Sequence, residues 1–213
     1  MGEGIPTLID RAVATRERRP AEADPTRERI LDAALEEAAQ VGLARLTVED
    51  VVRRAGLGRM TVYRRFARRD ELVEALVVRE CERFLAAVAA GLDPGAEPHD
   101  RLAGGFVAAM RFGRDHPLME RLAHTDPGAV MATVAANDAL LLDLGKEFIV
   151  AEILGEHPDA TAAAARRAAD LLARLFLTYV ALPPADPDPH DDEALRAFAR
   201  EVLAPLAESA LRT

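Results

Sequence analysis

Residues 56–72 read GLGRMTVYRRFARRDEL, and this stretch decides the fold. From residue 53 to residue 69 the chain has seven arginines and no acidic residue, although it contains 36 acidic and 27 basic residues in total. Gly56 and Gly58 predict a tight turn. Val62 and Phe66 lie four positions apart, so they predict the buried side of a short helix over 59–65. A short helix, a glycine turn and a second short helix favour a helix-turn-helix motif.

Two helices are predicted before this turn, and the second of them is the first helix of the helix-turn-helix motif. Asp24 and Pro25 are typical of a helix start, and Gly42 is expected to end that first helix as a left-handed C-cap. Thr47 and Asp50 form a modified capping box for the second helix. Apolar residues recur at helical spacing in both segments: Ile30, Leu31, Ala34, Leu35 and Ala38, then Val48, Val51, Val52 and Ala55.

The exposed side of the 59–65 helix carries a set of residues suited to DNA. The second helix of a helix-turn-helix enters the major groove, where arginine pairs with guanine. We expect Arg59, Met60, Tyr63 and Arg64 to face the groove, with phosphate contacts beside them. The full set of predicted DNA contacts is Thr47, Arg59, Met60, Thr61, Tyr63, Arg64, Arg68 and Arg69. For Arg53 and Arg54, pairing with Glu49 and Asp50 on a solvated helix face is an equal alternative.

Charge is divided unevenly along the chain. Residues 1–70 carry a net charge of +2, whereas residues 71–213 carry −11. This asymmetry predicts that residues 1–70 bind an anionic partner and that the acidic remainder of the chain does not. Residues 1–24 include Arg16, Arg18 and Arg19, which could reach a minor groove, but intervening acids favour a flexible arm without that role.

Composition favours an all-α protein, because alanine and leucine are abundant and β-branched residues form no alternating runs. Cys81 is the single cysteine, which excludes an internal disulfide and a cysteine-based zinc site. Its place on an apolar helical pattern indicates a packing role. No apolar run reaches the length of a membrane span and no signal peptide is recognisable, so we expect a cytoplasmic protein without a membrane partner.

The rest of the chain predicts a larger helical domain. A long helix begins near Asp70 and is broken by the turn-forming residues 91–98. Further helices are expected over 99–115, 118–125, 129–155, 159–182 and 192–211, the last of them kinked at Pro205. The predicted organisation is an arm over 1–24, a helix-turn-helix domain over 25–70 and a second helical domain over 71–213.

At residues 26–76 the chain resembles the TetR family of bacterial transcriptional repressors. The matching string is TRERILDAALEEAAQVGLARLTVEDVVRRAGLGRMTVYRRFARRDELVEAL. Its hallmarks are Ile30, Ala33-Ala34, Gly42, Thr47, Val51 to Gly56, Thr61-Val62-Tyr63, Phe66 and Asp70-Glu71-Leu72. Gly58, Met60, Arg65 and Arg69 depart from the residues common in the family, which leaves the operator sequence open.

The resemblance implies a ligand-binding second domain that forms a homodimer on a double-stranded, palindromic DNA operator. The predicted interface lies on apolar stripes of the last two long helices and includes Leu172, Leu175, Phe176, Tyr179, Phe198 and Val202. The alternative is that these stripes serve only the internal core of one chain.

A pocket for a small-molecule effector is expected among the helices from residue 70 to residue 182. Its candidate lining is Phe84, Val88, Phe106, Met110, His116, Met119, Asn137, Asp138, Phe148 and Tyr179. For each of these residues alone, ordinary core packing is the competing interpretation. His116 and His124 match no common metal site, so neither a metal nor another cofactor is expected.

The leading hypothesis is therefore a repressor that a small, lipophilic ligand releases from its operator. The alternative is a DNA-binding regulator without a small-molecule effector, which is constitutive or controlled by a protein partner. No nucleophile–base set, carboxylate pair or phosphate loop stands out, so we do not expect an enzyme.

Overall fold

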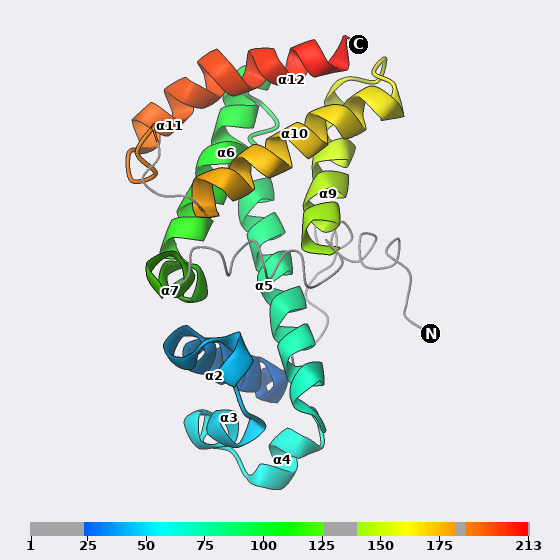
Figure 1. Cartoon of the computed structure of the whole chain (residues 1–213). Helices are drawn as coiled ribbons and strands as arrows, with labels where there is room; N and C mark the ends of the chain where they lie inside the picture. Colours follow the sequence, from blue (N-terminus) through cyan, green and yellow to red (C-terminus); the bar gives the residue numbers. More distant parts are fainter. Residues whose placement is uncertain (1–23, 126–139, 182–185, 213) are drawn as a thin grey trace.

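The computed structural model describes residues 24–125, 140–181 and 186–212, and in these ranges every regular element is helical (Figure 1). This confirms the predicted all-α class. The predicted N-terminal arm lies outside the described residues. The helices are α2 (Pro25–Val41), α3 (Val48–Ala55), α4 (Arg59–Tyr63), α5 (Arg69–Gly91), α6 (Pro98–Asp115), α7 (Pro117–Thr125), α9 (Leu140–Glu156), α10 (Ala162–Ala181), α11 (Asp192–Phe198) and α12 (Ala204–Leu211).

The head consists of α2, α3, α4 and the start of α5. Asp24 caps α2 as predicted, because its carboxylate accepts hydrogen bonds from the backbone N–H groups of Thr26 and Arg27 at 3.0 and 3.2 Å. These helices, together with Leu118 of α7, enclose one buried apolar cluster. It contains Ile30, Leu31, Ala33, Ala34, Ala38, Leu46, Val48, Val51, Ala55, Val62, Phe66, Leu72, Leu76 and Leu118. The helical spacing in the sequence therefore predicted the inner faces of α2, α3 and α4 correctly.

Two details of the head differ from the sequence prediction. Gly42 has φ +86° and ψ 153°, so it ends α2 with a positive φ but not in the left-handed helical conformation. A 3-10 turn over Leu43–Arg45 follows it and leads the chain away from the helix axis. The helix predicted over 59–65 ends at Tyr63, and Arg64 is its C-cap.

α5 is a 23-residue helix that runs from the head into the body, the helical part from α6 to α12 (Figure 1). Its end crosses α6 through glycines that permit close backbone contact. A Cβ atom added at Gly91 would lie 2.6 Å from the carbonyl oxygen of Gly104, and one added at Gly104 would overlap the carbonyl oxygen of Gly91. Because α5 also contributes Leu72 and Leu76 to the head core, it crosses the predicted boundary at residue 70.

The body is built from α6, α9, α10, α11 and α12 around the upper half of α5. The first part of the helix predicted over 129–155 lies outside the described residues, and α9 begins at Leu140. The single kinked helix predicted over 192–211 is three elements instead: α11, a π-helical turn over Ala199–Leu203, and α12. Pro205 occupies the first turn of α12, and the wider π turn before it accommodates the missing proline N–H.

Candidate DNA-reading surface and body cavities

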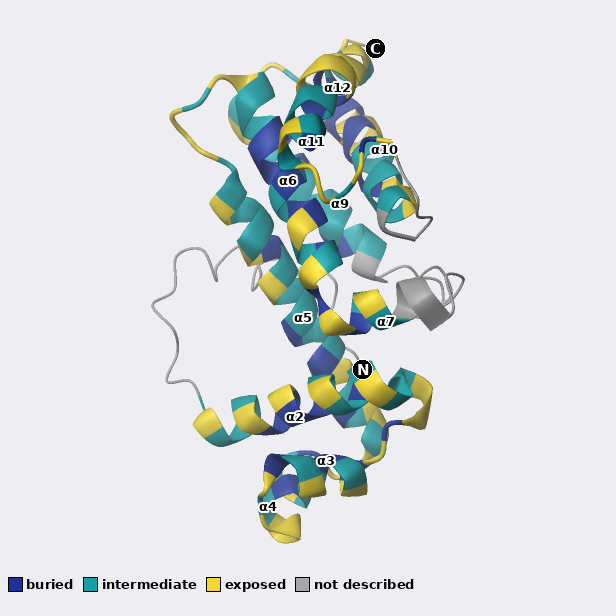
Figure 2. Cartoon of the chain, turned by 90° about the vertical axis from the view of Figure 1, so that its left-hand side faces the viewer, coloured by how far each residue is buried: buried dark blue, intermediate teal, exposed yellow. Residues whose placement is uncertain are grey.

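α4 forms an exposed edge of the molecule, at the end opposite α12 (Figures 1 and 2). Gly56 makes the turn before it in the left-handed conformation, with φ 61° and ψ 31°. Val62 is fully buried and Phe66 nearly so, which points the opposite side of α4 to solvent. On that side Met60 is 81% exposed, and Arg59 and Arg64 are exposed as well. The structure thus brings together the side chains predicted to face a DNA groove.

A cluster that the sequence did not predict organises this surface. The Arg59 guanidinium lies over the Tyr63 ring, 5.2 Å from its centroid, and 3.2 Å from a carboxylate oxygen of Glu49 in α3. The Tyr63 hydroxyl donates a hydrogen bond to the same oxygen. This bond raises the pKa of Tyr63 and lowers that of Glu49. Glu49 therefore holds two candidate DNA contacts in place and neutralises part of their charge.

The predicted threonine contacts occupy different environments. Thr47 caps α3: its hydroxyl oxygen accepts from the backbone N–H of Asp50 at 3.2 Å and donates to the Asp50 carboxylate at 2.5 Å. Asp50 therefore meets the threonine hydroxyl, whereas in a capping box the acidic side chain accepts from the N-cap backbone N–H. Thr61 is half-buried in the first turn of α4.

The arginines after α4 are tied into the head by contacts of their own. Arg65 pairs with the capping residue Asp24 at 2.8 Å, and Arg68 pairs with Glu71 at 2.9 Å. Arg69 donates to two backbone carbonyl oxygens, those of Leu43 and Leu46, at 2.6 and 2.9 Å. Arg69 thus joins the start of α5 to the loop before α3, and its predicted phosphate contact stays a prediction.

The arginines Arg53 and Arg54 of α3, for which two interpretations were open, both meet carboxylates. Arg53 pairs with Asp50, as the solvated-face alternative expects. Arg54 reaches α2 instead, where Glu37 lies at 2.7 Å. Both side chains therefore neutralise nearby acids, and Arg54 also holds α3 against α2.

The body contains an outer cavity of about 160 Å³ between α5, α6, α9 and α10. Four predicted pocket residues, Phe84, Val88, Phe106 and Phe148, line it. Its charged groups meet one another: Arg101 lies 2.8 Å from Glu152 and 2.5 Å from Glu156. The sequence did not predict the remaining lining, which is Leu85, Leu92, Arg101, Leu102, Gly105, Ala109, Gly145, Ile149, Glu152, Ile153, Glu156, Leu172, Ala173, Phe176 and Leu203.

A second, inner cavity of about 200 Å³ lies nearer the head. The predicted residues Phe84, His116 and Met119 line it. Leu43 of the head forms part of its wall, so the cavity borders the joint between head and body. The Phe84 and Phe176 rings stack with centroids 5.1 Å apart and contribute to both cavities. The other lining residues are Leu76, Val77, Glu80, Cys81, Phe112, Gly113, Leu118, Leu142, Gly145, Ala173 and Leu177.

Two predicted pocket residues that the structure describes, Met110 and Tyr179, are not in either lining. Met110 packs in a buried cluster with Val107 and Leu195. Tyr179 contacts the rings of Phe106 and Phe198 and donates its hydroxyl proton to a backbone carbonyl at 3.0 Å. Asn137 and Asp138 lie outside the described residues.

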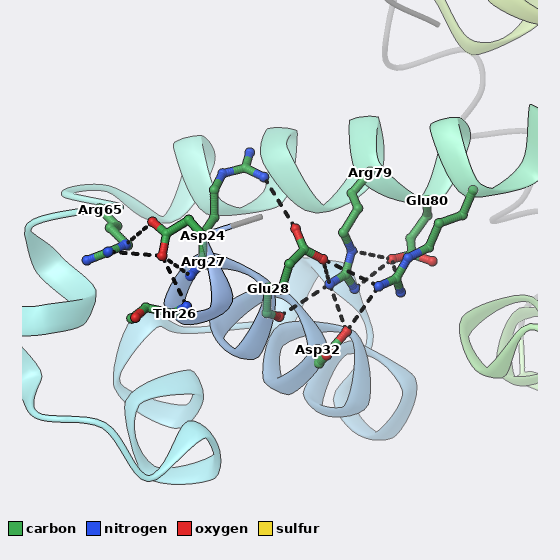
Figure 3. Close-up of polar contacts among 9 residues, drawn as sticks. Asp24, Thr26, Arg27, Glu28, Asp32, Arg65, Arg79 and Glu80 are labelled. Carbon is green, nitrogen blue, oxygen red and sulfur yellow. Dashed lines mark hydrogen bonds and ion pairs between the residues drawn. The ribbon is translucent and has the colours of Figure 1, made fainter. Parts of the chain in front are cut away.

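A chain of polar side chains connects the inner cavity to α2, and Figure 3 shows the part of this chain from Glu80 through Arg79 to Asp32. Arg79 of α5 is only 5% exposed, and its guanidinium lies 2.8 Å from Asp32 and 3.4 Å from Glu28, both in α2. On its other side Arg79 donates to Glu80 at 2.7 Å. Glu80 in turn lies 3.2 Å from His116. His116 is therefore three polar contacts away from the first helix of the head, and Glu80, which also lines the cavity, is two contacts away.

The predicted interface residues are distributed over three environments. Phe176 and Leu172 line the outer cavity. Leu175, Phe198 and Tyr179 pack against neighbouring clusters within the chain. Val202 is 46% exposed, and Leu206, one turn further along, is also exposed. Of the predicted set, Val202 is thus the one that presents an apolar side chain to solvent.

No helix among the described residues is long and apolar enough to cross a membrane. The same residues contain no group of three histidine, cysteine, aspartate or glutamate side chains placed to hold a metal ion.

Comparison with known families connects the head to a defined class of proteins. Residues 30–76 match the model of bacterial regulatory proteins of the tetR family. An uncharacterized HTH-type transcriptional regulator of Mycobacterium tuberculosis is 28% identical over 183 residues, which are 86% of each chain. The HTH-type transcriptional regulator AlkX of the same organism is 28% identical over 191 residues, or 85% of each chain.

Solved structures share the fold over most of the chain. The TetR family repressor AlkX from a Dietzia species, implicated in biodegradation of n-alkanes, has a TM-score of 0.63 at 24% identity, over 86% of this chain and 98% of that one. SmeT in complex with triclosan has a TM-score of 0.62 at 23% identity, over 86% and 91% of the two chains. These likenesses concern the arrangement of the helices.

Proposed function

Because this chain belongs to the TetR family of bacterial regulatory proteins, and is a DNA-binding transcriptional regulator rather than an enzyme, we propose that it is a ligand-released repressor. In this proposal a homodimer binds a palindromic operator through two copies of α4. A small apolar molecule that enters the body then lowers the affinity for DNA.

The observation that carries this proposal is the course of α5. Its first turns pack into the head core through Leu72 and Leu76, and its later turns line both cavities through Phe84. A single helix is stiff along its axis, so a ligand that moves the cavity wall also moves the base of the head. The ligand acts only if it binds the non-reading arrangement more tightly than the reading one.

The head is suited to reading DNA because its exposed helix offers both kinds of contact. Arg59 and Arg64 can pair with guanine in the major groove, while Tyr63 and Thr61 can bind phosphate oxygens. Thr47, Arg68 and Arg69 are proposed as further phosphate contacts. Met60 adds an exposed apolar side chain that can meet a thymine methyl group.

A dimer contacts a longer stretch of DNA than one short helix can read. α4 has five residues, so a single head contacts only a few base pairs. We propose that α10 and the run from α11 to α12 form the twofold interface. Exposed Val202 and Leu206 support this placement, and Leu175 and Phe198 would then reinforce it from beneath.

A relative in fold supports the ligand part of the proposal. SmeT was solved as a complex with triclosan, so that protein binds a small organic molecule. Both cavities of the present chain are lined mainly by apolar side chains, which suits a lipophilic effector.

The proposal is tested with DNA from upstream of the protein's own gene. Fluorescence anisotropy should show binding whose logarithm falls with the logarithm of salt concentration at a slope of about −7, if about eight phosphates are neutralised. A thermal-shift screen of lipophilic compounds should then identify stabilising molecules, and these should dissociate the complex.

The alternative is a regulator without a small-molecule effector. A broad library that yields no stabilising compound would favour this alternative, and so would stabilising compounds that leave the DNA complex intact. Absence of salt-dependent binding to any upstream fragment would contradict both.

A further inference from the structure

His116, in the wall of the inner cavity, carries a buried polar atom for which the described residues supply no partner. Among the lining residues that the structure describes, Glu80 and His116 alone have side chains with nitrogen or oxygen atoms. His116 is 8% exposed, and its ring packs against Phe112 with centroids 5.3 Å apart. Its Nε2 lies 3.2 Å from Glu80, whereas its buried Nδ1 has no hydrogen-bond partner in the described part of the chain. A buried polar atom of this kind is costly unless something binds to it.

The neighbours of Glu80 define which hydrogen-bonding role this atom has. Burial alone would raise the pKa of Glu80, but the hydrogen bond with His116 and the charges of Arg79 and Arg83 together lower it. The ionised carboxylate can only accept hydrogen bonds, so Nε2 of His116 must carry the proton between them. In the neutral imidazole, Nδ1 is then an acceptor.

An acceptor at the wall of an apolar cavity selects for a donor. We propose that the inner cavity binds a neutral, largely apolar molecule through one hydroxyl group, which donates a hydrogen bond to Nδ1 of His116. This inference deepens the proposed function and rests on the body being the ligand-responsive part. A carboxylate ligand fits less well, because it would lie close to the negative charge of Glu80.

The size of the cavity narrows the class of ligand further. Its volume of about 200 Å³ exceeds the roughly 150 Å³ of an engineered apolar cavity that binds benzene. One aromatic ring with a short alkyl chain and a hydroxyl group therefore suits the space, and alkylphenols are the simplest such molecules. The hydroxyl would then join the chain of contacts that leads from His116 through Glu80 and Arg79 to Asp32 of α2.

The first test compares three probes of similar shape on the purified full-length protein, without DNA, by isothermal titration calorimetry. The probes are 4-propylphenol, 4-propyltoluene and 4-propylbenzoate. The phenol should bind about tenfold more tightly than the toluene, because only the phenol satisfies Nδ1. Equal binding of phenol and toluene, tightest binding of the benzoate, or binding of none of the three would overturn the inference.

Two substitutions of His116 distinguish the role of Nδ1 from that of Nε2. His116→Gln places its amide near the position of Nε2 and leaves nothing at Nδ1, so the preference for the phenol should disappear. His116→Asn keeps a polar atom near Nδ1 and should retain the preference. His190→Gln, in an exposed turn, is the matched control and should behave as the parent protein. A phenol preference that survives in His116→Gln contradicts the assignment.

A spectroscopic measurement on the unsubstituted protein tests the same atom if a variant does not fold. Nitrogen-15 correlation spectra should show His116 protonated at Nε2, and the Nδ1 signal should move when the phenol binds but not when the toluene binds. An Nδ1 signal that the phenol leaves unchanged would overturn the inference.

Operator release is measured separately with the same probes. Phenol binding that leaves the DNA complex intact would contradict the proposed release mechanism and leave the inference standing. If a different compound released the operator and the phenol did not bind, the release mechanism would stand and the inference about His116 would be contradicted.

Discussion

The head and the body are both built from helices, yet they are packed in different ways. The head encloses one continuous apolar cluster. The described part of the body has three smaller clusters, with cavities of about 160 and 200 Å³ beside them. A close-packed core holds a surface helix in one position, whereas a core with voids can rearrange when a ligand fills them. This difference supports the proposal that the head presents α4 to DNA and that the body responds to a ligand.

The largest expected effect concerns Cys81 in the wall of the inner cavity. Burial, reinforced by the nearby charges of Glu82 and Glu80, raises the pKa of its thiol from 9.0 to about 12. Near neutral pH the thiolate fraction is then about a thousandfold smaller than for an unperturbed thiol. Labelling with a chromogenic disulfide should be slower by about this factor than in the protein unfolded by guanidinium. A native rate within tenfold of the unfolded rate would mean that the body is open at this cavity.

The second expected effect concerns the joint between the two regions. Arg79→Met should lower the free energy of unfolding by about 3 kcal/mol, because it leaves the carboxylates of Glu28, Asp32 and Glu80 without their buried partner. Urea denaturation at a fixed protomer concentration measures this change.

Arg83→Met is the matched control for Arg79. Arg83 meets the same three acids, but its side chain is 43% exposed, so solvent screens its ion pairs. Its replacement should cost less than about 1 kcal/mol. Equal losses in the two variants would show that the buried network does not hold head and body together.

The third prediction uses one substitution at two glycines of the body. Gly104→Ala should destabilise the protein by about 1–2 kcal/mol, because the new Cβ meets the backbone of α5 at Gly91. Gly145→Ala should stabilise it by up to about 1 kcal/mol, since a Cβ there has no atom within 4 Å and alanine favours the helix. Thermal unfolding measures both changes. If both substitutions changed the stability in the same direction, the distinction between the tight α5–α6 crossing and the loosely filled cavities would be contradicted.

The smallest expected effect is a change in operator affinity caused by a substitution in the head. Glu49→Gln should tighten operator binding by about threefold, because it frees Arg59 and Tyr63 and removes a negative charge near the phosphates. Glu201→Gln, at an exposed site in the body, should leave the affinity unchanged. Anisotropy titrations at matched salt measure both. Weaker binding of Glu49→Gln would mean that this carboxylate is needed to position the reading surface.

The sequence predicted the head better than the body for a physical reason. The inner faces of α2, α3 and α4 follow from local spacing, and Val62 and Phe66 are buried as that spacing requires. Contacts between residues distant in sequence were not predictable in this way. Arg65 forms an ion pair with Asp24, which lies 41 positions earlier in the sequence, and Arg69 donates hydrogen bonds to backbone carbonyl groups of the loop before α3.

In the body the sequence identified apolar residues but not the spaces between them. Phe84 and Phe148 line a cavity, whereas Met110, on an equally regular stripe, is enclosed by Val107 and Leu195. Helical spacing tells which side of a helix is apolar, but not whether a neighbour fills the space in front of it. Gly145 and Ala173 line both cavities and were missed, because small residues leave space that an apolar pattern does not show.

The central claim is that the exposed side of α4 reads DNA and the body does not. Operator titrations of the double variant Arg59→Ala, Tyr63→Phe test it most directly, with Arg174→Ala on the exposed side of α10 as the control. We expect the double variant to retain its helical content and to bind the operator about a hundredfold more weakly, while the control binds as the parent protein does. An unchanged operator affinity of the double variant would contradict the claim.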